Sequence, residues 1–365
     1  MFPFTAEAHA TAASPATLLE KFREHMVEHG LEVQGPLAAT CIAFPEGRAM
    51  LHLKDGVIAL RIEAATPDIL AEAKATVSGH LEAFAPGEAL GIAWAGARTA
   101  GTNNRPHNFR ATRVLRVADV TPRMRRVTLR GPELARFDAE MLHVKILIPD
   151  ENSARGADGE PAWPSLAPNG QASLDGCALV RRTYTIRRID AAAGELDIDF
   201  VLHGEGSPGS RFAAKARPGD WLGLTGPGGG HVPLQGWTLI AGDETALPAI
   251  ARALETMPRE ARGRAVIEVA NAAEQQFLDH PPGFELHWLP RDGAACGARL
   301  LEAVLNLAWP EEEVSAWAAC EAETARQLRD RWAAEPRLAG RRFRAAAYWR
   351  QGAAEGTAPS GSGTA

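Results

Sequence analysis

The chain has 365 residues, of which 45% are hydrophobic and 23% charged, and its formal net charge is −6. This length predicts two or three domains, the negative charge gives no support to nucleic-acid binding, and no apolar run approaches the roughly 18 to 20 residues of a membrane span. The start of the chain, with Glu7 and His9, does not resemble a secretory signal, and four widely separated cysteines favour a reducing cytoplasm.

Residues 1–98 have the pattern of a small α+β domain. A hydroxyl residue followed by proline, at Ser14-Pro15 and again at Thr66-Pro67, marks the start of each of two helices. Short apolar runs separated by turn residues are typical of an antiparallel sheet and occur at Cys41–Phe44, Met50–Leu53, Val57–Ile62 and Leu90–Trp94. Residues 99–107 are polar and include Gly, Asn and Pro, so we expect a linker.

Residues 108–232 have β character. Six runs are predicted strands: Arg113–Val117, Met124–Leu129, His143–Ile148, Ala178–Arg188, Glu195–Val201 and Trp221–Thr225. Their uneven spacing between turns predicts an antiparallel β-barrel. The segment Asp150–Gly176 has little apolar periodicity, and we expect it to be a long loop.

Residues 236–352 alternate between strand and helix patterns, which predicts a parallel sheet covered by helices. The predicted strands are Thr238–Ile240, Ala265–Val269, Glu285–Leu289, Val314–Ala318 and Phe343–Ala347. The predicted helices are Pro248–Met257, Ala272–Leu278, Ala298–Leu307 and Glu321–Trp332. The tail, residues 353–365, consists mainly of small and polar residues and is predicted to be disordered. The chain is thus expected to be a multidomain α+β protein with a small α+β domain, an antiparallel barrel and a C-terminal α/β domain.

The strand Arg182-Thr183-Tyr184-Thr185 presents a guanidinium, an aromatic ring and a hydroxyl. Arg182 can bind a pyrophosphate, Tyr184 can pack on a flat ring, and Thr185 can hydrogen-bond that ring. These are the needs of a flavin adenine dinucleotide (FAD) site. Alternating polar and aromatic residues also occur by chance in barrel strands, so the motif gains weight only from the segments that come after it in the chain.

The next of these segments is a glycine-rich turn, with His203-Gly204 before Gly209-Ser210. Glycine lets the backbone approach a phosphate, and a helix start offers free N–H groups to an anion. In this interpretation Ser210 is the N-cap of the helix and a phosphate donor. The turn could also simply join a strand to a helix.

The segment Gly242-Asp243-Glu244-Thr245-Ala246 follows a buried strand and opens a helix. A strand, a turn and a helix start form a dinucleotide crevice at the carboxyl edge of a parallel sheet, so Asp243, Thr245 and Ala246 are candidate cofactor-binding residues. The usual G-x-G-x-x-G fingerprint is missing. The carboxylates could instead complement the helix dipole.

Over residues 108–352 the chain resembles the siderophore-interacting protein family of flavin ferric reductases, within the ferredoxin reductase superfamily. The matching segments are Val120–Leu129, His143–Lys145, Arg182–Thr185, His203-Gly204 with Gly209-Ser210, Pro218–Asp220, Gly226–Gly229, Gly242–Ala246 and Tyr348–Arg350 with Gly352. The first hundred residues resemble a small domain of unknown function that accompanies such reductases. The resemblance implies a flavin barrel followed by a nicotinamide-type domain.

The resemblance also implies an enzyme that reduces ferric siderophores with bound FAD, using NADPH, NADH or a reduced ferredoxin. Flavin carries the chemistry, so we expect no protein acid or base. Many ferric siderophores are anionic, and a basic patch would attract them. Lys145 is the first candidate for that patch, followed by Arg350 and Arg291. Each could instead be a solvated surface charge.

Two departures from the family pattern bear on the electron donor. The family usually has Ala-Gly-Glu at Ala319-Cys320-Glu321, and a glycine where this chain has Ala347. A side chain at Cys320 would narrow the path of the hydride, or it is simply a small residue. Cys320 therefore leaves a non-catalytic ferric-chelate binding protein as an alternative. A flavin oxidoreductase for another acceptor, such as quinone or free flavin, is a second alternative, and the basic patch separates it because neutral acceptors need no such patch.

The N-terminal domain contains five of the eleven histidines. His25 and His29 are four residues apart on one predicted helix and could share a metal. No other ligand stands nearby in sequence, so surface histidines are the preferred interpretation, and no metal is predicted.

Overall fold

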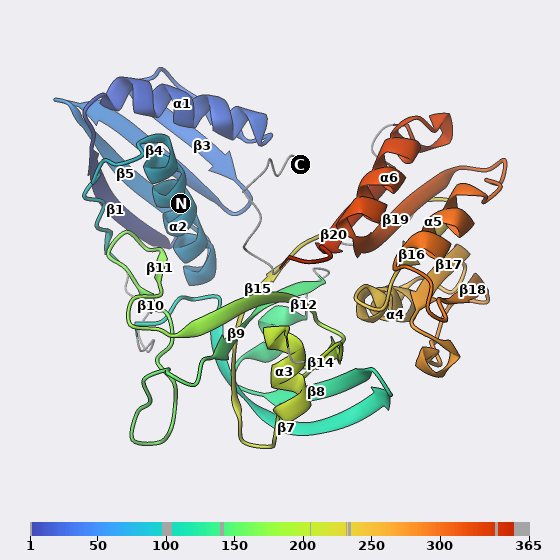
Figure 1. Cartoon of the computed structure of the whole chain (residues 1–365). Helices are drawn as coiled ribbons and strands as arrows, with labels where there is room; N and C mark the ends of the chain where they lie inside the picture. Colours follow the sequence, from blue (N-terminus) through green and yellow to red (C-terminus); the bar gives the residue numbers. More distant parts are fainter. Residues whose placement is uncertain are drawn as a thin grey trace. The chain divides into compact units, whose positions relative to one another are not determined.

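The computed structural model describes residues 2–96, 104–138, 142–204, 206–230, 232, 235–339 and 342–353. Its contacts divide the chain into two compact units, drawn in Figure 1: unit 1 is residues 1–109 with 152–178, and unit 2 is residues 110–151 with 179–365. Most of the predicted disordered tail and part of the predicted linker lie outside the described residues. The five-part division of the chain stays a prediction.

Unit 1 contains a six-stranded antiparallel sheet in the order β2-β3-β4-β5-β1-β6. Its strands are β1 Phe4–Thr11, β2 Glu32–Gln34, β3 Ala39–Phe44, β4 Gly47–Lys54, β5 Val57–Ala64 and β6 Ala95–Gly96. Helices α1 (Pro15–Glu28) and α2 (Pro67–Phe84) cover one face of the sheet (Figure 1). Leu19 and Phe22 of α1 and Leu81 of α2 are fully buried against the sheet, as their helical spacing requires.

Two sequence predictions for unit 1 need correction. The run Leu90–Trp94 is not a strand, although Leu90 and Ile92 are buried. Gly91 adopts a φ of +66°, which interrupts the extended backbone, and pairing begins only at β6. Strand β1 was missed because its inward residues are alanines, which give little apolar alternation.

The segment 152–178 lies between two barrel strands in sequence but packs in unit 1. It is largely irregular, as predicted, apart from the short hairpin β10 (Ser165–Leu166) and β11 (Ala172–Ser173). The Glu82 carboxylate of α2 accepts hydrogen bonds from Asn169 Nδ2 at 2.9 Å and from Gln171 Nε2 at 2.6 Å. Trp94 Nε1 donates to the Asn169 carbonyl at 3.0 Å. These bonds attach the segment to α2 and to Trp94.

The first part of unit 2 is a seven-stranded antiparallel, barrel-like sheet in the order β12-β9-β15-β7-β8-β14-β13. Its strands are β7 Phe109–Thr121, β8 Met124–Arg130, β9 His143–Pro149, β12 Leu179–Thr185, β13 Arg188–Asp190, β14 Glu195–Val201 and β15 Trp221–Gly228. All six predicted strands are present, and the predicted strand Ala178–Arg188 is divided into β12 and β13. The turn η1 (Leu134–Phe137) and helix α3 (Pro208–Lys215) complete this part.

The second part of unit 2 is a five-stranded parallel sheet in the order β18-β17-β16-β19-β20. Its strands are β16 Trp237–Gly242, β17 Arg262–Val269, β18 Gly283–Pro290, β19 Val314–Glu321 and β20 Phe343–Trp349. Its helices and turns are α4 Leu247–Thr256, α5 Ala298–Leu305, α6 Ala322–Ala333, η2 Ala272–Glu274 and η3 Pro336–Leu338. Strand order reverses between β16 and β19, and ligands of open α/β sheets commonly bind beside the carboxyl ends of such strands.

The predicted helix Ala272–Leu278 is wrong, because only the single turn η2 forms there. Asn271 Oδ1 accepts from Ala273 N at 2.9 Å, and the chain then becomes extended at Gln275. The amide side chain therefore satisfies a local turn instead of a continuing helix.

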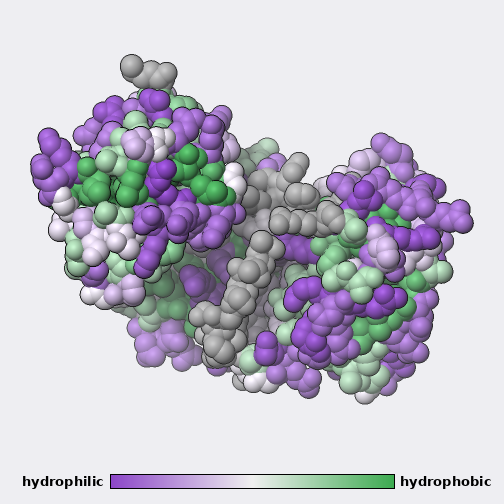
Figure 2. All heavy atoms as spheres, turned by 90° about the horizontal axis from the view of Figure 1, so that it is seen from above, coloured by the Kyte–Doolittle hydropathy of each residue, from purple (hydrophilic) through white to green (hydrophobic). Residues whose placement is uncertain are grey.

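Hydrophilic residues cover much of the face drawn in Figure 2, with smaller hydrophobic areas between them. Within the described part of the chain, none of the helices combines the length and apolar character that crossing a bilayer requires.

Candidate functional site

Strand β12 carries Arg182, Tyr184 and Thr185 at the edge of the barrel sheet. It pairs with β9, so that Thr183 lies opposite Lys145 and Tyr184 opposite Val144. Because side chains alternate along a strand, Arg182 and Tyr184 share one face, whereas Thr185 points to the other and is 5% exposed. The Tyr184 ring packs on Phe200 with 4.4 Å between ring centroids.

The glycine turn and the start of α3 meet Tyr184 directly. A Cβ on Gly209 would overlap the Tyr184 hydroxyl oxygen and lie 2.9 Å from Cζ of the same ring. Gly204 adopts a φ of +96°, which favours glycine. The first-turn N–H groups of a helix have no acceptor within the helix, and in α3 these include the N–H groups of the buried residues Gly209 and Ser210. Two motifs that are separate in sequence therefore form one site.

The role predicted for Ser210 as N-cap is wrong. The N-cap of α3 is Ser207, and Ser210 lies in the first turn with 2% of its side chain exposed. Its Oγ accepts a hydrogen bond from the backbone N–H of His203 at 3.1 Å. Ser210 thus fastens the turn to the helix, while the side chain of His203 is exposed.

In the α/β part, Asp243 directly follows the carboxyl end of β16, next to the neighbouring strand β19, and is buried. One carboxylate oxygen accepts from Thr245 N at 2.9 Å and from Thr245 Oγ1 at 2.5 Å, and the other accepts from Trp349 Nε1 at 2.7 Å. Burial raises the pKa of Asp243 to about 6, and the hydrogen bonds from Thr245 and Trp349 oppose that rise. Ala246 N donates to the Asp243 carbonyl at 3.0 Å. The three predicted residues therefore shape one tight turn.

Sequence reasoning missed three side chains that the structure brings together beside β9. His143 Nε2 lies 2.6 Å from the Tyr348 hydroxyl oxygen, and Arg344 precedes Tyr348 by four residues on β20. Burial, together with the charges of Arg344, Lys145 and Arg252, lowers the pKa of His143 to about 4. The sequence does contain an indication of this cluster. His143 lies in the family-like segment that contains Lys145, and Tyr348 lies in the one that contains Arg350.

The predicted cations have different surroundings. Lys145 is exposed on the same strand face as His143, and its Nζ donates to Thr183 Oγ1. Arg350 is exposed just beyond β20, where its charge contributes to lowering the pKa of Glu323. Lys145 therefore lies beside His143 together with Arg344 and Arg252, whereas Arg350 acts on Glu323.

Arg291 does not fit the predicted role in a basic patch. It is only 7% exposed, and it donates to Glu244 at 2.6 Å and to Glu268 at 3.3 Å. The hydrogen bond to Glu244 raises its pKa further. Two carboxylates neutralise this guanidinium, so it connects the turn after β16 to β17 instead of attracting an anion.

Cys320 is fully buried at the end of β19, in the hydrophobic cluster that includes Leu300 and Leu328. Burial raises the pKa of its thiol, so the thiolate is disfavoured. Of the two interpretations of this departure, the geometry favours a small residue in the core.

An antiparallel barrel-like sheet with a glycine turn, followed by a parallel sheet in which strand order reverses, is the arrangement expected of a flavin-binding part followed by a nucleotide-binding part. Family models give the same division. The siderophore-interacting FAD-binding domain matches residues 113–231, and the siderophore-interacting protein model matches residues 235–352. Residues 7–95 match an uncharacterized protein conserved in bacteria (DUF2218).

Individual relatives agree. The chain is 36% identical over 245 residues to ferric vibriobactin reductase ViuB of Vibrio cholerae. The aligned region covers 64% of this chain and 86% of the relative. It is 32% identical over 248 residues to the NADPH-dependent ferric-chelate reductase of Escherichia coli, and this alignment covers 66% of this chain and 92% of the relative. The crystal structure of a siderophore utilization protein from T. fusca superposes with a TM-score of 0.60 at 39% identity, covering 69% and 96%. The chain belongs to the siderophore-interacting protein family, which confirms the resemblance seen in its sequence.

Proposed function

We propose that this protein is a cytoplasmic, FAD-dependent ferric-siderophore reductase that takes electrons from NADPH or NADH and releases iron as Fe(II). The observation that carries the proposal is the contact between the Tyr184 ring and Gly209, which brings the Arg182 strand and the start of α3 to one place. Only glycine fits there, as expected where a backbone must approach both a ring and a phosphate.

The residues present fit the dinucleotide. Arg182 NH1 donates to the Arg181 carbonyl at 2.7 Å, and the planar guanidinium has further N–H donors for a pyrophosphate. The N–H groups of Gly209 and Ser210 lie at the N-terminal end of α3, which is the positive end of the helix dipole and favours the negative charge of a pyrophosphate. Because β12 is the edge strand, a ligand along it can reach both the Arg182 face and the face that carries Lys145.

When bound, FAD supplies the redox chemistry, because it divides the two electrons of one hydride between two acceptors, so that one NADPH reduces two Fe(III) to Fe(II) and leaves NADP⁺ and one proton. Siderophore oxygens are hard ligands that hold Fe(III) far more tightly than Fe(II), so reduction loosens the complex. No protein side chain has to move a proton on the chelate.

The side chains beside β9 are suited to attract the substrate. Lys145 and Arg344 place two positive charges near His143, whose lowered pKa keeps its imidazole neutral near pH 7. Fixed charges raise the encounter rate with anionic chelates. The names of the relatives in V. cholerae and E. coli support a ferric chelate as substrate, and the second supports NADPH as donor.

The test is the spectrum of the purified full chain, followed by anaerobic titration. We expect flavin absorbance that bleaches with NADPH or NADH, and then decay of ferric-chelate absorbance with a ferrous trap present, at two Fe(II) per nicotinamide. A chain without flavin that takes up none when FAD is added would overturn the proposal. Flavin that only reduced ferredoxin can bleach would change the donor, and flavin that reduces quinones but not ferric chelates would change the substrate.

A further inference from the structure

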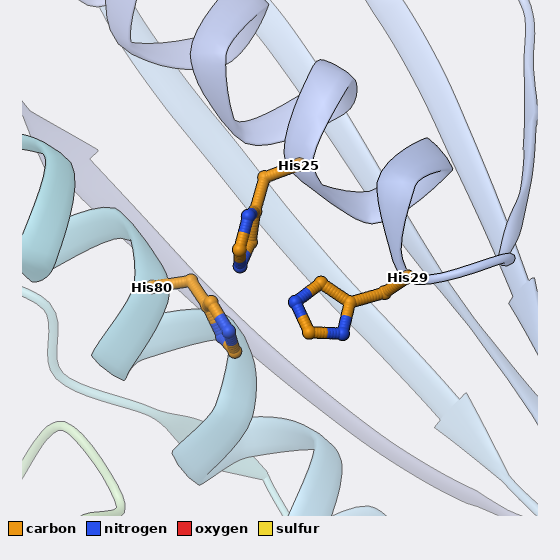
Figure 3. A group of neighbouring side chains, drawn as sticks. All are labelled: His25, His29 and His80. Carbon is orange, nitrogen blue, oxygen red and sulfur yellow. The ribbon is translucent and has the colours of Figure 1, made fainter. Parts of the chain in front are cut away.

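We propose that the N-terminal domain holds a divalent transition-metal ion through His25, His29 and His80. One ring nitrogen from each of the three lies within 4.8 Å of the other two. Figure 3 shows the three imidazoles gathered in the space between α1 and α2, with His29 beside the end of α1. The proposal concerns unit 1 alone and does not depend on the proposed function.

Helix geometry brings these rings together. His25 lies in the last turn of α1 and His29 is its C-cap residue, so the two project from the same side of that helix. His80 comes from α2, which packs against α1, and its ring centroid is 5.0 Å from that of His25 and 6.2 Å from that of His29. The third ligand, which the sequence could not show beside the first two, is supplied by tertiary packing.

Hydrogen bonding prepares His80 as a ligand. Its Nδ1 lies 2.8 Å from the Thr76 carbonyl oxygen, which can only accept, so Nδ1 carries the hydrogen and Nε2 keeps the lone pair. A backbone carbonyl that fixes the second nitrogen is the usual partner of a metal-ligating histidine. The Glu28 carboxylate lies 3.6 Å from His25 Nδ1 and adds negative charge beside the cluster.

The donor set selects the class of ion. Three neutral imidazoles suit Zn(II), Fe(II), Co(II), Ni(II) and Cu(II), whereas Mg(II), Ca(II) and Fe(III) prefer oxygen. Ligand nitrogens around a tetrahedral ion at about 2.0–2.1 Å lie roughly 3.3 Å apart, whereas the three ring nitrogens lie within 4.8 Å of one another. The nitrogens must therefore approach one another by up to about 1.5 Å through side-chain rotations. His29 is exposed, which leaves that side open for water as a further ligand. The site therefore accepts the ferrous product of the proposed reaction but not its ferric substrate.

The competing account is that the histidines serve only as packed rings. His25 lies edge-on to Phe84 with 5.2 Å between centroids, and His80 lies edge-on to Phe22 at 6.4 Å. Such contacts contribute to packing whether or not a metal binds. Two measurements distinguish the accounts: the affinity of the protein for metal ions, and the loss of that affinity when the exposed ligand His29 is replaced.

The test uses the full chain, treated with a chelator and then titrated with Co(II), Zn(II) and, without oxygen, Fe(II). We expect binding of one ion per chain, visible as Co(II) absorption bands, with no competition from Mg(II). His29→Ala should weaken Co(II) binding at least about tenfold, because even partners of metal ligands cost that much. The matched control is His52→Ala, which removes an exposed histidine on β4.

Two further measurements test whether weaker metal binding reflects loss of a ligand or loss of the fold. Circular dichroism should show that His29→Ala keeps its helices, and Zn(II) should raise the unfolding temperature of the wild type and of His52→Ala but not of His29→Ala. Equal affinities in the two variants, or failure of the wild type to bind any of the three ions, would overturn the proposal. Flavin content should be the same in all three proteins, so the result is independent of the reductase assignment.

Discussion

His143 Nε2 and the Tyr348 hydroxyl oxygen lie 2.6 Å apart and join β9 of the barrel to β20 of the α/β part. Burial lowers the pKa of His143 to about 4 and raises the pKa of Tyr348, so both partners are neutral near pH 7. The bond therefore connects the two parts of unit 2 without adding charge, and the positive charge beside it comes from residues such as Arg344, Lys145 and Arg252.

The first prediction concerns pH. The pKa of His143 in the folded protein, about 4, lies below the ordinary value of about 6.5, so the unfolded chain binds this proton more readily. The corresponding contribution to the free energy of unfolding, about 3 kcal/mol, is fully present above pH 6.5 and is lost as the pH falls towards 4. We expect the NMR signal of the His143 ring to stay constant from pH 8 to about 5.5. The signal that disappears in the His143→Gln variant is the one that belongs to His143. A titration midpoint above pH 6 for this signal would contradict the prediction.

The second prediction concerns the pyrophosphate. Arg182→Ala should weaken FAD binding about 10- to 100-fold, because hydrogen bonds to charged groups are worth about 1.5–3 kcal/mol. The measurement is fluorescence titration of flavin-free protein with FAD. Arg181→Ala is the matched control, because its side chain points to the opposite face of β12 and should leave affinity within about twofold. Full flavin occupancy in Arg182→Ala would show that this residue does not bind the cofactor.

The third prediction concerns Gly209. Gly209→Ala should displace the Tyr184 ring, which Phe200 confines, at a cost of about 1–3 kcal/mol, and FAD retention should fall. Gly206→Ala is the control, since a Cβ there meets nothing within 4 Å and should change stability by no more than about 0.5 kcal/mol. Adding Tyr184→Phe to Gly209→Ala should restore retention only in part, because Cζ stays within 2.9 Å of the new Cβ. Equal flavin content in the two alanine variants would refute the contact's role.

The fourth prediction concerns substrate attraction. Lys145→Ala should lower kcat/KM for anionic ferric chelates about three- to tenfold and leave neutral chelates nearly unchanged, and added salt should reduce the difference. Removing Arg344 as well should enlarge the effect. Lys54→Ala, which removes an exposed lysine of unit 1, is the control. Similar losses on anionic and neutral chelates would mean that Lys145 acts through structure and not through charge.

Local patterns predicted most of the barrel and the α/β part, because strand alternation, glycine turns and helix periodicity depend on residues that are close in sequence. They failed at Leu90–Trp94, where Gly91 interrupts a buried run, and at Ala272–Leu278, where the Asn271 side chain satisfies a turn. They also misjudged Arg291 and Ser210. Each of these depends on a partner that local sequence does not reveal: Glu244 and Glu268 for the arginine, and the His203 N–H for the serine.

The sequence by itself determined the family, and it predicted the order of domains and the residue types of a flavin site, since these are properties of segments. Only the tertiary structure decided which segments meet: Tyr184 with Gly209, His143 with Tyr348, and His25 and His29 with His80. The physical reason is that a contact between distant residues depends on how whole helices and strands pack. That packing arises from many small contributions along the chain, and no single motif encodes it.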